Sequence, residues 1–173
     1  MKRTLLTLLA LSLPAALAQT TTPPAQAGPQ PVQLATTPSV TQASLSLAAA
    51  VRIAQLAVNN CAQQGYNVAA TVVDRAGVTL AVARAENAGP HTVDASLRKA
   101  YTSASARNLT SAMVQNLAST PTLADIPGFL VLAGGVPVRV NNAVVGAVGV
   151  GGAPSGLTDE KCAADAITTV LSR

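Results

Sequence analysis

Residues 122–154, TLADIPGFLVLAGGVPVRVNNAVVGAVGVGGAP, decide the fold of this chain. The stretch contains three short apolar runs, at residues 129–132, 136–140 and 144–150. A double glycine at 134–135 and a double asparagine at 141–142 separate the runs, and both tolerate the positive φ angles of tight hairpin turns. The pattern predicts a three-stranded β-meander, then a glycine-rich loop, and then a helix capped by Thr158.

The residues before this stretch predict further helices and strands. Apolar residues at helical spacing cover 47–61, and Gly65 marks the end of that helix. Runs rich in β-branched residues at 68–73 and 78–83 predict a hairpin. Two helices are expected at 92–107 and 111–118. The apolar stripe expected to be buried on the first of these two helices consists of Val93, Leu97, Ala100, Tyr101 and Ala104.

The predicted element order is one helix, two strands, two helices, three strands and one helix. The simplest architecture for this order is an α/β (α+β) domain, in which about five antiparallel strands carry helices on their faces. A parallel Rossmann-type sheet is disfavoured because strands and helices do not alternate.

The first 40 residues differ in composition from the rest. Residues 1–18 have a basic start, a short apolar stretch and a small-residue site, which indicate a secretory signal peptide cleaved after Ala18. An uncleaved anchor is the alternative. Residues 19–40 are rich in Thr and Pro and nearly uncharged, so we expect a disordered linker. The folded domain is expected at 41–173, in a secreted, periplasmic or extracellular protein without a membrane span after cleavage.

The charge pattern argues against a nucleic-acid partner. Only 10% of the residues are charged, the formal net charge is +4, and the chain contains two Tyr, one Phe and no Trp. Surfaces that bind nucleic acid need clustered basic residues and aromatic rings for stacking, and this sequence supplies neither.

The two cysteines, Cys61 and Cys162, predict one disulfide. Export would place them in an oxidising compartment. Cys61 lies on the buried stripe of the first helix and Cys162 in the first turn of the last helix, and these helices could share one face of the sheet. Two separate buried thiols are the alternative. Two cysteines and one histidine are too few for a structural zinc site.

Several motifs together resemble the GlcG/HbpS family of haem-binding proteins. The similarity covers about residues 46–170. The motifs are VVDRAG (72–77), AGP (88–90), RKAYT (98–102), PTLADIPG (121–128), LAGGVPV (132–138) and GVGGAPSG (149–156), followed by Asp159.

The resemblance implies a profilin-like, GlcG-like domain that assembles into a homo-oligomer, with an octamer as the expected size. It also implies binding of haem, or of a related tetrapyrrole, outside the cytoplasm. The protein would act there as a carrier, a sink or an accessory of a partner sensor protein. Some relatives are associated with haem degradation, so a redox enzyme acting on the tetrapyrrole is the first alternative. A ligand-free oligomeric scaffold is the second. We favour a binding protein over an enzyme.

Haem needs an apolar slot, cations for its propionates and often an axial ligand. His91, the only histidine, is a candidate iron ligand at the entrance of a helix, with a solvated surface residue as the alternative. Arg98 or Lys99 could meet a propionate while Thr102 faces the porphyrin edge, as the RKAYT resemblance implies. The alternative for this segment is a solvated helix face with an Asp94–Arg98 ion pair.

Three further features have weaker functional interpretations. Tyr101 is expected in the core, although its phenolate could ligate ferric iron. Met113 is a possible soft ligand, but a lone methionine is more often packing. The loop at 149–156 could bind an anion through its backbone amides, whereas tight turning explains the same glycines. Neither a nucleotide P-loop nor a hydrolase nucleophile elbow is present, so no catalytic residue is predicted.

Overall fold

The structure is a computed structural model that describes residues 31–172. Residues 31–40 are exposed and contain neither helix nor strand, and the chain forms a compact unit from Thr41 onward. The predicted signal peptide and linker residues 19–30 lie outside the described residues. They therefore stay predictions.

The domain is an α+β fold, which confirms the predicted class. Its elements are α1 (Leu47–Ala62), β1 (Ala69–Asp74), β2 (Thr79–Arg84), α2 (Thr92–Ala106), α3 (Thr110–Asn116), the 3-10 helix η1 (Pro121–Asp125), β3 (Gly135–Val140), β4 (Ala143–Gly151) and α4 (Gly156–Leu171). The strands form one sheet in the order β2-β1-β4-β3, and every neighbouring pair is antiparallel. The asparagines at 141–142 both adopt positive φ, as the tight β3–β4 turn requires.

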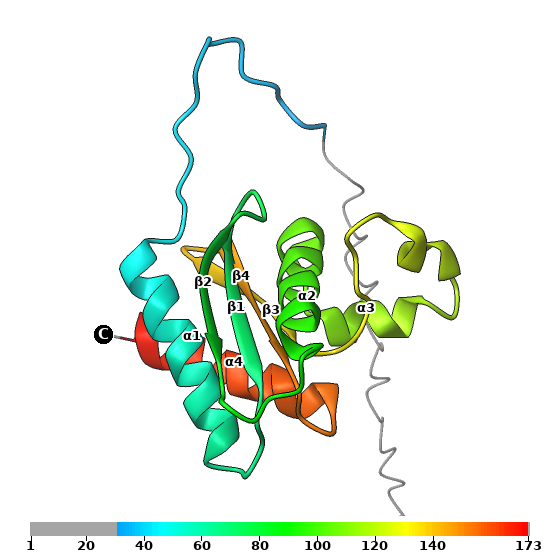
Figure 1. The fold of residues 1–173 in the computed structure, drawn as a ribbon. Coiled ribbons are helices and arrows are strands. Elements are labelled where there is room, and N and C mark those ends of the chain that lie inside the picture. Colours follow the sequence, from blue (N-terminus) through cyan, green and yellow to red (C-terminus); the bar gives the residue numbers. More distant parts are fainter. Residues whose placement is uncertain (1–30, 173) are drawn as a thin grey trace, which may run out of the picture. The chain divides into compact units, whose positions relative to one another are not determined.

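Two layers of helix sandwich the sheet (Figure 1). Helices α1 and α4 pack side by side on one face, and α2 covers the other. The main core lies under α1 and α4, where Ile53 and Ala163 meet sheet residues such as Val72 and Val148. This apolar burial is the main stabilising contribution of that layer.

Helix α2 approaches the opposite face unusually closely because two strand glycines leave room for its backbone. A Cβ atom on Gly149 would lie 2.0 Å from the backbone oxygen of Ser96, and one on Gly135 would lie 2.5 Å from that of Lys99. Any side chain at these positions would push the helix away. The glycines thus determine where α2 holds its side chains over the ends of β3 and β4.

The sheet has four strands where the sequence predicted about five, because residues 129–132 do not form a strand. The amide of Phe129 donates to the oxygen of Ile126 at 3.0 Å, and the amide of Leu130 donates to Thr102 Oγ1 at 2.8 Å. Local turns and a side chain therefore satisfy the groups that a sheet ladder would need.

The predicted buried face of α2 was partly wrong. Tyr101 is 37% exposed, whereas Lys99 and Thr102 are buried. The sheet face under α2 combines glycines and Thr71 with small apolar residues, so small side chains of both kinds fit there. For example, Ser96 Oγ and Thr71 Oγ1 lie 2.7 Å apart. The predicted α4 cap was also wrong. Helix α4 begins earlier, at Gly156, and its cap is the Ser155 side chain, which accepts from the amide of Leu157 at 3.2 Å.

Candidate functional site

A cavity of about 560 Å³, here called the α2–α4 cavity, lies between the start of α2, helix α3 and the β4–α4 loop. This volume is within the range typical of small-molecule and cofactor sites. Its lining residues are His91, Ala95, Lys99, Ser111, Val114, Gln115, Leu132, Ala133, Gly151, Gly152, Ala153, Gly156, Leu157 and Asp159.

Most of the lining is apolar, and part of it faces solvent. Leu132 is 53% exposed and Leu157 is 63% exposed, and Val114 is exposed beside them. Clustered apolar side chains in contact with water often indicate a surface that another molecule covers. The α2–α4 cavity can therefore accept a flat or extended apolar ligand.

His91 stands at the rim of this cavity, immediately before α2. Its imidazole lies against Gly89, where an added Cβ would be 2.9 Å from His91 Cε1. The side chain is exposed, and among residues 31–172 no hydrogen bond engages its ring nitrogens. A neutral imidazole in this position can ligate a metal ion.

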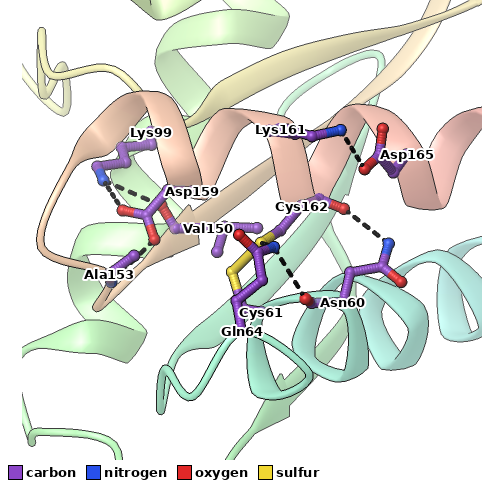
Figure 2. The surroundings of a disulfide bond; sticks show 10 residues. All are labelled: Asn60, Cys61, Gln64, Lys99, Val150, Ala153, Asp159, Lys161, Cys162 and Asp165. Carbon is purple, nitrogen blue, oxygen red and sulfur yellow. Dashed lines mark hydrogen bonds and ion pairs between the residues drawn. A yellow bond between two sulfur atoms is a disulfide. The ribbon is translucent and has the colours of Figure 1, made fainter.

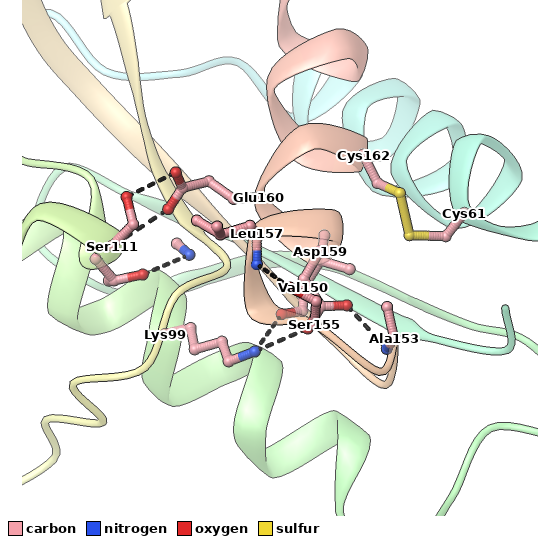
Figure 3. A network of polar contacts seen from close by, with 12 residues as sticks. Cys61, Lys99, Ser111, Val150, Ala153, Ser155, Leu157, Asp159, Glu160 and Cys162 are labelled. Carbon is pink, nitrogen blue, oxygen red and sulfur yellow. Dashed lines mark hydrogen bonds and ion pairs between the residues drawn. A yellow bond between two sulfur atoms is a disulfide. The ribbon is translucent and has the colours of Figure 1, made fainter. Parts of the chain in front are cut away.

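A buried ion pair forms one part of the polar lining of the α2–α4 cavity (Figure 3). The Lys99 ammonium lies 2.9 Å from Asp159 Oδ2 and donates to the oxygen of Val150 at 3.0 Å. Asp159 Oδ1 accepts from the amide of Ala153 at 3.0 Å. This network ties α2, β4 and the first turn of α4 together and fixes the glycine-rich loop between them. The alternative interpretation of this segment as a solvated helix face therefore does not hold for Lys99, which is buried.

A second set of polar contacts positions α3, which forms the opposite wall (Figure 3). Glu160 accepts from the amide of Ser111 at 3.2 Å and from its hydroxyl at 2.8 Å. The amide of Gly135 donates to Thr110 Oγ1 at 2.8 Å. The start of α3 is therefore bound to both α4 and β3.

A separate concavity of about 500 Å³, here called the α2–β2 hollow, lies on the other side of α2. It contains Arg98, whose Nε is 2.9 Å from Asp94 Oδ2 in the ion pair that the spacing predicted. It also contains Tyr101, whose ring packs against that of Phe129 in a T-shaped arrangement with the ring centroids 6.3 Å apart.

The structure therefore divides the predicted site residues. His91 and Lys99 line the α2–α4 cavity, whereas Arg98 and Tyr101 line the α2–β2 hollow. Thr102 lines neither, because its buried hydroxyl donates to the oxygen of Arg98 and accepts from the amide of Leu130.

Met113 is buried and outside both linings, as expected of a packing residue. The lining residues that sequence reasoning did not propose include Ser111, Val114, Leu132 and Leu157. The signal for two of them was present, because Leu132 begins the LAGGVPV motif and Leu157 directly follows the GVGGAPSG motif.

Cys61 and Cys162 form a disulfide that joins α1 to α4 (Figure 2). The S–S distance is 2.15 Å and the Cα atoms are 5.6 Å apart. Beside it, Asn60 Nδ2 donates to the oxygen of Cys162 at 3.2 Å. These links hold the second turn of α4, which directly follows the turn that carries Asp159.

Within residues 31–172, no helix is long and apolar enough to span a membrane. In the same part of the chain, no three His, Cys, Asp or Glu side chains cluster in a way that could hold a metal ion.

Comparison with known proteins shows similarity along nearly the whole domain. Residues 45–168 match the protein family described as "Haem degrading protein HbpS-like". The crystal structure of a double mutant of HbpS from Streptomyces reticuli is 42% identical, with coverage of 84% of this chain and 99% of that chain and a TM-score of 0.76. The protein ORFY from Klebsiella pneumoniae is 28% identical, with coverage of 78% and 98% and a TM-score of 0.71. An uncharacterized 15.0 kDa protein from the dhaT–dhaS intergenic region of Citrobacter freundii is 33% identical over 115 residues, which are 64% of this chain and 81% of that protein.

Proposed function

Because this chain belongs to the family of HbpS-like haem degrading proteins, we propose that it binds haem, or a related tetrapyrrole, in the α2–α4 cavity. The observation that carries this proposal is the combination of exposed apolar side chains with one accessible imidazole at the rim. Haem proteins use an apolar enclosure for the macrocycle and a nitrogen ligand for iron.

The residues present fit such a ligand in two of three respects. Leu132, Leu157 and Val114 offer the apolar contact, and His91 offers the axial nitrogen. The one full cation of the lining, Lys99, is already paired with Asp159. The lining therefore offers no unpaired cation to the propionates of haem. We expect the propionates to point out of the open mouth of the cavity, where solvent stabilises their charge. Arg98 lies in the other hollow, so its predicted contact with a propionate is not part of this proposal.

We assign the protein the role of binding the tetrapyrrole rather than of transforming it. The protein would serve outside the cytoplasm as a carrier, a sink or an accessory of a sensor protein. Export rests on the signal-peptide pattern of residues 1–18. Assembly into a homo-oligomer, with an octamer as the expected size, is part of the same proposal. Such an assembly would cover exposed apolar residues outside the cavity, such as Val82 on the edge strand β2 and Val78 just before that strand.

Degradation of haem is the second candidate, and the family description favours it. The two functions differ in what happens to the macrocycle under air and reductant. A carrier leaves the absorption of bound haem constant, whereas a degrading enzyme makes it decay with turnover.

A haemin titration with matched variants tests the site. Wild-type protein should give a saturable Soret shift, and His91→Ala should change the spectrum of the complex. Leu157→Glu places a carboxylate among the apolar contacts and should weaken binding about tenfold or more, since burying one leucine is worth ~1.5–3 kcal/mol. Leu47→Glu is the control, because Leu47 is 61% exposed in the first turn of α1, outside the cavity.

The possible outcomes of these experiments separate the alternatives for binding, site and activity. No Soret shift in the wild type would contradict haem binding. Unchanged affinity in Leu157→Glu, with weakened binding in Tyr101→Phe, would move the ligand to the α2–β2 hollow. Incubation of the wild-type complex with reductant in air then separates carrier from degrading enzyme.

A further inference from the structure

Three arginine side chains surround a small concavity that the haem proposal does not use. The concavity has a volume of about 190 Å³, and its lining contains no acidic residue. Its lining residues are Arg75, Arg107, Arg139, Asn142, Ala143 and Val144. We call it the arginine pocket.

The arginine pocket lies at the opposite end of the sheet from the α2–α4 cavity. It gathers the β1–β2 turn, the β3–β4 turn and the end of α2, and Figure 1 shows both turns at the same end of the sheet. The α2–α4 cavity instead lies at the other end of β4 and the start of α2. The nine residues of β4 separate the two sites by roughly 25–30 Å at the usual rise per residue.

The fold holds one of these guanidinium groups in place. Arg139 donates from Nη2 to the oxygen of Arg107 at 2.6 Å and from Nη1 to the oxygen of Asn142 at 3.4 Å. Both acceptors are backbone carbonyls, so they leave the positive charge of Arg139 uncompensated by an acid. A guanidinium has five N–H donors, and these two bonds leave others for a ligand.

The other two arginines add charge without an acidic partner. Among residues 31–172, the ion pairs involve Arg98, Lys99 and Lys161 and none of the pocket arginines. Asp74 is the acid next to Arg75 in the sequence, and its Oδ1 accepts from the amides of the β1–β2 turn.

The backbone also places Arg107 in an unusual way. Arg107 follows the last turn of α2 with φ 54° and ψ 33°, a left-handed conformation that glycine normally occupies at this position. Glycine would adopt this conformation without strain, yet here an arginine occupies the position and lines the pocket.

From this arrangement we propose that the arginine pocket binds a small oxyanion of the phosphate class that carries two or more negative charges. Arginine forks match the geometry of phosphate oxygens and form charge-assisted hydrogen bonds with them. The small volume suits one phosphate group and excludes a macrocycle. The arginine pocket shares no residue with the α2–α4 cavity, so this proposal can be tested independently of haem binding.

Isothermal titration of the purified full chain with inorganic phosphate and with pyrophosphate tests the proposal. Arg75→Gln is the main variant, because among the described residues its side chain makes no hydrogen bond whose loss would disturb the fold. Arg139→Gln is the second variant. Each should weaken binding about tenfold or more, as expected for a lost charge-assisted hydrogen bond. Arg52→Gln is the matched control, since it removes the same charge from the exposed surface of α1.

Saturable binding in the wild type and in Arg52→Gln, weakened in both pocket variants, would support the site. Absence of saturable binding of either anion up to about 10 mM would overturn it. Equal weakening in Arg52→Gln, or complete loss of binding when added sodium chloride raises the ionic strength, would also overturn it, because general surface attraction is screened by salt. Unchanged affinity in Arg75→Gln and Arg139→Gln would have the same consequence.

Discussion

The buried ion pair between Lys99 and Asp159 offers a sharp test of the structure. Replacement of Asp159 by Ala removes the carboxylate that lies 2.9 Å from the Lys99 ammonium. The ammonium is then left buried with one remaining acceptor, the oxygen of Val150. The amide of Ala153 loses its acceptor as well. We expect the free energy of unfolding to fall by about 3–5 kcal/mol, the usual cost of breaking a buried pair from one side.

The same helix supplies a matched control. Lys161 and Asp165 form an ion pair of 2.8 Å in α4, but both side chains are more than half exposed. Asp165→Ala should cost at most about 0.5 kcal/mol, since solvent screens exposed pairs. The double variant Lys99→Met with Asp159→Leu should recover much of the loss, because it leaves no buried charge.

Urea unfolding followed by far-UV circular dichroism measures these differences. The protein concentration should be held constant, since assembly would otherwise shift the apparent stability. Reductant should be absent so that the disulfide stays intact. An Asp159→Ala variant within about 1 kcal/mol of the wild type would refute the burial of this pair. Equal losses in Asp159→Ala and Asp165→Ala would do so as well.

Other features of the fold give further tests. Gly149→Ala should lower the free energy of unfolding by roughly 3 kcal/mol or prevent folding, because its Cβ would lie 2.0 Å from the backbone oxygen of Ser96. Gly65→Ala is the control and should cost only about 1 kcal/mol, because the space around Gly65 is open. Thiol counting in denaturant without reductant should find no free thiols, and two free thiols per chain would contradict the disulfide. Replacement of both Cys61 and Cys162 by Ala should lower the free energy of unfolding by about 4 kcal/mol, as expected for a closed loop of this length. Light scattering should report an assembly well above one chain, and a monomer at micromolar concentration would contradict the proposed oligomer.

Local sequence rules determined most of the secondary structure. Helical spacing located α1, α2 and α4 to within a few residues, and the double asparagine at 141–142 located the β3–β4 turn. These features are set by neighbours in the chain, such as a turn's need for positive φ, and so they can be inferred without the fold. The sequence motifs likewise indicate the family without any information on the fold.

The tertiary structure alone decided which apolar run stays out of the sheet and which polar residue is buried. Residues 129–132 have the composition of a strand, but Thr102 from a distant helix takes the amide of Leu130. Lysine is a residue type usually found at the surface, but Asp159, sixty positions later in the sequence, compensates the charge of Lys99 inside the protein. Both outcomes depend on partners remote in sequence, for which hydrophobic periodicity carries no signal.

The division of the candidate site has the same cause. Arg98 and Lys99 are neighbours in the sequence, yet they face different concavities because consecutive residues point about 100° apart on a helix. Gly135 and Gly149 fix the close approach of α2 to the sheet, and only the packed fold shows which of its faces then lines which concavity. The sequence by itself determined the elements and the family, whereas long-range packing decided where the site lies.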